Sequence, residues 1–185
     1  MGRIVVSEFV SLDGVMEAPG GEPGYPHTGW TIPYHSADLV NDKLRETLDA
    51  SVLLLGRRTY ESFADAWPKR DGEFADKMNA MPKHVVTSAP DDLEWQNSTV
   101  LDGPVEKTVP RLRDSVDGDL LVVGSRTLVH ALLRAGLVDE LRLAVFPVVL
   151  GSGDRVFPES PEPIALELVD QRRFESGIAA LTYRR

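Results

Sequence analysis

The stretch LLVVGSRTLVHALL, from Leu120 to Leu133, decides the fold class of this chain. Residues 120–123 form a short, wholly apolar run, which is typical of a strand buried on both faces of a sheet. Gly124 ends the run, and leucines then recur at helical spacing between Ser125 and Ala135, before Gly136 provides a stop. A buried strand, a glycine turn and an amphipathic helix in succession indicate an α/β unit with a parallel sheet.

The same alternation extends along the whole chain. Further strands are expected at residues 3–12, 52–55, 84–87, 98–101 and 141–150, and helices at 36–50, 59–67 and 73–81. Ser36 is the expected cap of the first helix, and Thr108 that of a later helix with Pro110 in its first turn. Segments 165–174 and 178–183 predict an antiparallel hairpin at a sheet edge. The expected fold is α/β, with a mostly parallel central sheet and helices on both faces, in a single domain spanning residues 1–185.

Composition excludes several classes of function. The chain has no cysteine, which rules out disulfides, thiolate metal sites and a cysteine nucleophile. Its net charge of −9 argues against nucleic acid as a partner, and no apolar run approaches the ~20 residues of a membrane span. Met1 leads directly into a strand-like run without a signal segment, so a cytoplasmic protein is expected. The four histidines share no spacing, and no metal site is expected.

Three turns rich in glycine or hydroxyl groups follow expected buried strands. They are Gly56-Arg57-Arg58-Thr59, Thr87-Ser88 and Gly124-Ser125-Arg126-Thr127. The carboxyl ends of parallel strands meet at one edge of a sheet, so all three turns are expected there. The first and third also open helices, whose free N–H groups accept phosphate oxygens. Arg57 and Arg58 suit the ribose 2′-phosphate that distinguishes NADPH from NADH. Taken singly, each turn can equally be an ordinary strand-to-helix connection.

Four longer motifs carry a resemblance to a known superfamily. LLLGRRTYESF at 53–63, KHVVTS at 83–88, LLVVGSRTLVHALL at 120–133 and the final YRR resemble the dihydrofolate reductase superfamily in order and spacing. Within it, SLDG at 11–14 and GLVDELRLAVFPVVLGSGDRVF at 136–157 look closer to the reductase domain of riboflavin biosynthesis and its stand-alone relatives. The resemblance implies a dihydrofolate-reductase-like three-layer fold, NADPH as the cofactor, and a homodimer. The zinc ligands of the deaminase domain that accompanies this reductase are absent from the sequence.

The resemblance also implies roles for particular residues. Gly56 to Thr59 would hold the pyrophosphate and the 2′-phosphate, Thr87 and Ser88 the adenosine side, and Gly124 to Leu128 the other face of the pyrophosphate. The implied activity is hydride transfer from NADPH to a small heterocyclic substrate. The type reaction is that of a 5-amino-6-(5-phosphoribosylamino)uracil reductase. Two alternatives stay open, a dihydrofolate reductase and an NADP-binding module without catalysis.

Candidate residues for the substrate side come from the two loops expected near the nicotinamide. Asp13 and Asp38 are candidates for orienting the substrate or relaying a proton, although each also suits a turn or a first helical turn. Trp30 and Tyr34 are candidates for stacking on a flat ring, and the alternative is that they anchor a loop. The apolar run 141–150 is a plausible subunit contact for the implied homodimer.

Overall fold

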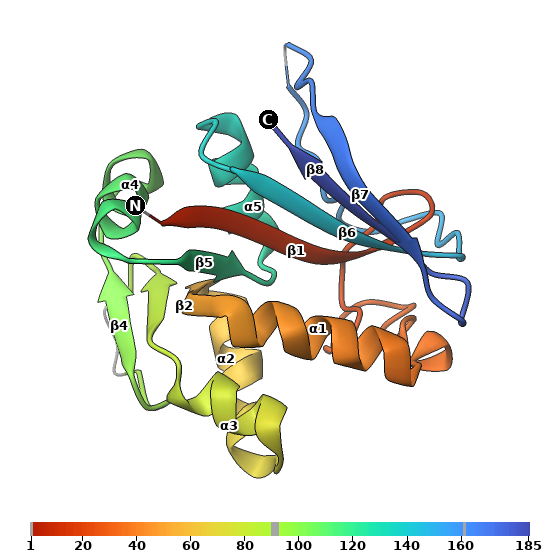
Figure 1. The fold of residues 1–185 in the computed structure, drawn as a ribbon, viewed down its shortest axis with the longest axis horizontal. Coiled ribbons are helices and arrows are strands. Elements are labelled where there is room, and N and C mark those ends of the chain that lie inside the picture. Colours follow the sequence, from red (N-terminus) through yellow and green to blue (C-terminus); the bar gives the residue numbers. More distant parts are fainter. Residues whose placement is uncertain (1, 90–92, 161) are drawn as a thin grey trace.

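An eight-stranded sheet forms the centre of the molecule in a computed structural model that describes residues 2–89, 93–160 and 162–185 (Figure 1). Its order is β4-β3-β2-β5-β1-β6-β8-β7. The strands are β1 (Arg3–Ser11), β2 (Ala50–Gly56), β3 (Lys83–Val86), β4 (Ser98–Leu101), β5 (Asp119–Val122), β6 (Glu140–Phe146), β7 (Glu167–Arg173) and β8 (Ala179–Arg184). The first six run parallel, whereas β8 pairs antiparallel with both β6 and β7. The predicted parallel sheet with an antiparallel C-terminal hairpin is confirmed.

Helices cover both faces of this sheet. They are α1 (Ala37–Asp49), α2 (Arg57–Ala66), α3 (Glu73–Ala80), α4 (Val105–Ser115) and α5 (Arg126–Arg134), with short 3-10 turns η1 (Ile32–Tyr34) and η2 (Trp67–Lys69). Apolar side chains of α4 and α5 share one core cluster, and those of α2 and α3 share another. Helix α1 lies beside α3 (Figure 1). The result is three layers, with the sheet in the middle.

Alternate residues of the central strands supply these two clusters. Ile4 and Val6 of β1 pack toward α4 and α5, while Val5 between them packs toward α2 and α3. Leu54 and Leu53 of β2 divide in the same way, and both are fully buried. Because both faces are covered, residues 4–6 of β1 and 52–55 of β2 read as continuous apolar runs in the sequence.

Two helices begin earlier than expected. Helix α2 starts at Arg57 rather than near Thr59, because Gly56 both ends β2 and serves as the N-cap. Helix α4 starts at Val105 behind Pro104, so Thr108 is not its cap. Its hydroxyl instead donates to the Pro104 carbonyl at 3.1 Å. Pro110 therefore lies inside α4 rather than in its first turn.

Ser36 and the run 141–150 also differ from expectation. Ser36 does occupy the N-cap of α1, but its hydroxyl bonds to the Asp38 side chain instead of capping the helix. Strand β6 ends at Phe146 because Pro147 follows, and a loop takes the rest of the run. Since β6 is paired with β1 on one side and β8 on the other, it has no free edge for a second copy. The predicted subunit contact along this run stays a prediction, and it cannot be made by strand pairing of β6.

None of the helices in the described ranges is both long and apolar enough to traverse a bilayer.

Candidate functional site

The turns after β2 and β5 lie against each other at the carboxyl edge of the sheet. A Cβ atom built on Gly56 would lie 2.3 Å from Ser125 Oγ and 2.8 Å from Ser125 Cβ. A Cβ atom built on Gly124 would lie 2.8 Å from Thr59 Oγ1. The two turns therefore interlock, and each needs a glycine at the contact. Gly124 also has φ of +63°, a conformation that residues with a Cβ rarely adopt.

The third turn, after β3, lies at the same edge. Gly56 pairs with Val86, the last residue of β3, and Thr87 and Ser88 follow it directly. The Thr87 hydroxyl closes a local turn by accepting a hydrogen bond from the Ala89 N–H at 3.1 Å. Ser88 is exposed. All three turns singled out in the sequence thus follow adjacent parallel strands, in the order β3, β2, β5.

Helices α2 and α5 start at the interlocked glycine turns. Their N-caps are Gly56 and Ser125, and neither makes a side-chain capping hydrogen bond. The first-turn N–H groups of a helix have no acceptor within the helix, and the helix dipole favours an anionic acceptor there. The Leu128 side chain is buried in the core, so Leu128 can meet a ligand only through its backbone.

Arginines place positive charge at both helix starts. The Arg57 guanidinium donates from Nε to Glu61 Oε1 at 2.6 Å, one turn further along α2. Arg58 is exposed beside it. On α5, Arg126 Nε lies 3.0 Å from Asp154 Oδ2, and Thr127 is exposed. The arrangement fits a phosphorylated, dianionic ligand, for which two interlocked helix N-termini with nearby guanidinium groups are a suitable cradle.

Asp13 ties the loop after β1 to the loop after β6. Its carboxylate accepts hydrogen bonds from Ser11 Oγ at 2.7 Å, from Leu150 N at 3.1 Å and from Gly151 N at 2.9 Å. Chiefly through Ser11, these hydrogen bonds lower the pKa of Asp13 to about 2. The group is therefore ionised at neutral pH, which suits a hydrogen-bond acceptor better than a proton donor.

Asp38 makes a similar tie at the start of α1. It accepts from the Ser36 hydroxyl, from Leu39 N at 2.9 Å and from Glu175 N at 2.8 Å in the turn between β7 and β8. The same hydrogen bonds, with that of Ser36 the largest, lower the pKa of Asp38. Both acidic candidates are thus held as carboxylates, each by a serine hydroxyl and by backbone N–H groups.

Trp30 and Tyr34 pack edge-on against Phe146, with ring centroids 5.2 and 5.8 Å away. Trp30 is only 7% exposed, and its indole N–H donates to the Glu17 carbonyl at 2.8 Å. This packing favours the loop-anchor interpretation for Trp30. Tyr34 is half-buried, so part of its ring faces solvent.

Glu8 belongs to this site, although the sequence reasoning missed it. It lies in β1, is 5% exposed, and its Oε1 accepts a hydrogen bond from Gly124 N at 2.7 Å. Burial raises the pKa of the Glu8 carboxyl to about 8, against the opposing effects of the Gly124 N–H and of Lys43. A signal was present in the sequence, because Glu8 interrupts the inward-facing series Ile4, Val6 and Val10.

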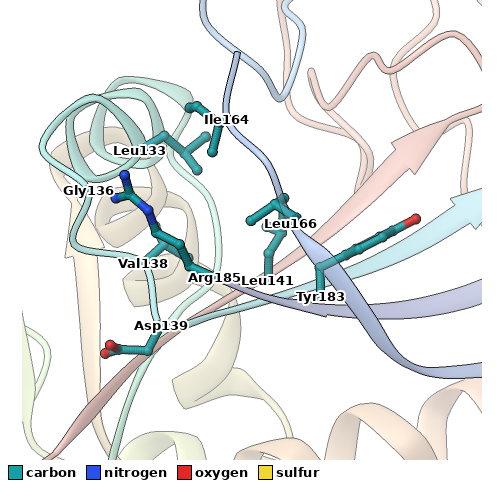
Figure 2. Close-up of a pocket in the computed structure, with 9 residues that line it drawn as sticks. All are labelled: Leu133, Gly136, Val138, Asp139, Leu141, Ile164, Leu166, Tyr183 and Arg185. Atoms are coloured by element: carbon teal, nitrogen blue, oxygen red, sulfur yellow. The ribbon is translucent and has the colours of Figure 1, made fainter. Parts of the chain in front are cut away.

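A separate hollow lies at the opposite end of the strands from the glycine turns, where β6 begins and β8 ends (Figure 2). Leu133, Ile164, Leu166 and Tyr183 give it a mostly apolar lining, with Arg185 next to Gly136. The hollow is remote from the glycine turns because it lies at the amino end of β6. In the described part of the chain, no group of three or more His, Cys, Asp or Glu side chains is placed to hold a metal.

Comparisons with known proteins agree with this architecture. Residues 3–180 match the family described as the RibD C-terminal domain. The chain belongs to this family. It is 27% identical over 190 residues to the uncharacterized protein YyaP of Bacillus subtilis, which covers 98% of this chain and 94% of that protein.

Two solved structures share the fold of this RibD C-terminal domain protein. A riboflavin biosynthesis protein from a Shewanella species superposes with a TM-score of 0.70 at 18% identity, covering 99% of this chain and 98% of that one. Dihydrofolate reductase from Enterococcus faecalis, complexed with NADP(H), superposes with a TM-score of 0.61 at 20% identity, covering 99% and 96%. The fold is therefore dihydrofolate-reductase-like, as the sequence motifs implied.

Proposed function

We propose that this protein is an NADPH-dependent reductase that transfers a hydride to a small heterocyclic metabolite of the ribosylamino-pyrimidine type. The observation that carries the proposal is the interlock of Gly56 and Gly124, which brings two helix N-termini together. Such an arrangement is suited to binding phosphates. Membership of the RibD C-terminal domain family supports a reductase. The solved dihydrofolate reductase with this fold was obtained with NADP(H), which supports the choice of coenzyme.

In this proposal the chain binds and orients, and the bound coenzyme supplies the hydride. The N–H groups at the starts of α2 and α5 hold the pyrophosphate, and Arg57 and Arg58 hold the 2′-phosphate. Thr87 and Ser88 lie on the adenosine side. Asp13 and Asp38, held as carboxylates, accept hydrogen bonds from N–H groups of the substrate ring and so fix its orientation. Tyr34 lies against a flat ring at the same edge.

A two-stage titration tests this function. NADPH is first added to the protein while fluorescence is followed, and saturable binding is expected. A ribosylamino-pyrimidine, dihydrofolate and related heterocycles are then added in turn, and loss of the reduced coenzyme's absorbance is measured. Turnover of the pyrimidine supports the proposal, and turnover of dihydrofolate alone replaces it with the folate alternative. Binding without oxidation of NADPH by any substrate favours a non-catalytic module.

We also propose that the protein is a homodimer joined through β7. This strand is the edge of the sheet, and all seven of its residues are exposed. Leu168 and Val169 are 44% and 41% exposed. An edge strand with exposed apolar residues is a favourable surface for pairing with a second copy. Light scattering is expected to give the mass of two chains, and Leu168→Lys is expected to give the mass of one. Val40→Lys, at an exposed apolar position of α1, is the matched control. A monomeric wild-type protein would refute the dimer.

A further inference from the structure

Glu8 stands apart from the other buried carboxylates of the described residues. Asp42 and Glu140 are as deeply buried, but each forms an ion pair with arginine: Asp42 with Arg172, and Glu140 with Arg3, Arg142 and Arg184. Among the described residues Glu8 has no arginine partner, and its Oε1 accepts a hydrogen bond from the backbone N–H of Gly124. A carboxyl group is costly to bury without a counter-charge, so its retention in the middle of the sheet calls for a local reason.

The position of Glu8 connects it to the proposed coenzyme cradle. Glu8 pairs with Leu143 of β6, while earlier residues of β1 pair with β5, whose end leads into Gly124. The Gly124 N–H points onto Glu8 Oε1, and on its other side Gly124 contacts Thr59 at the start of α2. Glu8 thus holds the Gly124 turn in place against α2. Without this acceptor the Gly124 N–H would lose its partner in a partly buried position.

The charged side chains on the elements next to Glu8 interact with other side chains. From α1, Lys43 approaches the other face of β1, and its Nζ is held by Ser7 at 2.9 Å and by Glu46 at 3.0 Å. Arg126 at the start of α5 pairs with Asp154, and Arg57 at the start of α2 pairs with Glu61. The β5 and β6 neighbours Val122 and Leu143 are apolar. Burial therefore dominates, and the pKa of Glu8 is raised to about 8, which leaves the carboxyl mostly protonated at neutral pH.

We propose that Glu8 is a positioning residue for the coenzyme: its buried carboxyl fixes the Gly124 turn against α2, and a negative charge on that carboxyl weakens binding of the coenzyme phosphates at the turn. This inference rests on the proposed function, because it requires a phosphorylated coenzyme at the cradle. Coenzyme binding should accordingly weaken as pH rises through the titration of Glu8. A buried charge close to a dianion changes affinity by on the order of tenfold.

The test compares NADPH dissociation constants from pH 7 to pH 9.5 for three proteins. Wild type is expected to bind about tenfold more weakly at the upper end than at the lower end. Glu8→Gln keeps an oxygen acceptor for Gly124 but has no acidic group, so its NADPH affinity should stay nearly constant with pH. Asp119→Asn, at the amino end of β5, removes a remote acid and should keep the wild-type slope.

A second readout does not depend on coenzyme. The Gly124 amide resonance in the free protein should titrate with a midpoint near pH 8, and this titration should vanish in Glu8→Gln. The folded-state pKa of Glu8 lies above its unfolded value of 4.5, so its contribution to stability is complete below that value and is lost as pH rises through about 8. Unfolding is therefore measured at each pH, and only affinities of folded protein are compared.

The outcomes separate the two proposals. If wild type binds no NADPH at any pH, the proposed function fails and the positioning role falls with it. If wild type binds NADPH equally well across the range, or Glu8→Gln retains the wild-type slope, the positioning role alone is overturned. An amide resonance of Gly124 that does not respond to pH also overturns it. A Glu8→Gln protein that fails to fold leaves the wild-type pH profile and the Gly124 titration as the deciding measurements.

Discussion

Replacement of both Arg57 and Arg58 by alanine is expected to weaken NADPH binding by about a hundredfold and to leave NADH binding within about threefold of wild type. Both residues lie in the first turn of α2, beside the Gly56 turn. The two coenzymes differ only by the ribose 2′-phosphate, and each charge-assisted contact to that group is worth roughly a factor of ten at a partly exposed site. Fluorescence titrations with the two coenzymes measure the ratio directly.

The ion pair between Arg57 and Glu61 supplies a matched control for this prediction. Glu61→Gln removes the ion pair but leaves both guanidinium groups in place, so NADPH binding should stay the same or become tighter. If the double alanine variant weakened NADPH and NADH equally, Arg57 and Arg58 would have no specific role at the 2′-phosphate. If Glu61→Gln alone weakened NADPH as strongly as the double variant, the arginines would act by holding α2 together.

The architecture could be predicted because buried strands and helix faces are apolar, and this pattern is visible in the sequence. Strands such as β2 and β5 are covered on both faces, so they appear as short apolar runs that stop at or just before glycine. The first residues of the helices were harder to predict from the sequence. Gly56 and Pro104 act as N-caps through their backbone conformation, without the hydroxyl or carboxylate side chain by which caps are recognised in a sequence.

Part of the candidate site could likewise be predicted from the sequence, and part could not. The glycine turns could be predicted because parallel strands must bring their carboxyl ends to one edge. The hydrogen bonds that hold the loops of the site together could not be predicted, since each joins residues more than a hundred positions apart. Asp13 reaches Gly151, Asp38 reaches Glu175, and Glu8 reaches Gly124. Nothing local to Glu8 indicates that its partner is a backbone amide of a turn after another strand.

Gly56→Ala is expected to weaken NADPH binding by at least about a hundredfold, because it separates the two halves of the cradle. The added Cβ would lie 2.8 Å from the Cβ of Ser125, an atom fixed to the backbone, so rotation of the serine hydroxyl cannot relieve the overlap. The α5 turn must shift, and the N–H groups of α2 and α5 then no longer converge on one pyrophosphate. Overpacking of this kind also costs about 1–3 kcal/mol of stability, which denaturant unfolding would detect.

A compensating substitution makes the argument specific to the interlock. Ser125→Gly removes both atoms with which the new methyl group would clash and leaves only an ordinary contact with Leu128 Cβ at 3.7 Å. The double variant Gly56→Ala with Ser125→Gly should therefore recover most of the lost affinity relative to Ser125→Gly alone. Gly20→Ala is the control, because its Cβ would meet only the flexible end of Glu22, at 3.2 Å. This rescue is expected only if the loss of affinity in Gly56→Ala comes from the steric clash between the two turns. If Gly56→Ala bound NADPH as tightly as Gly20→Ala, contact between the turns would not be what forms the coenzyme site.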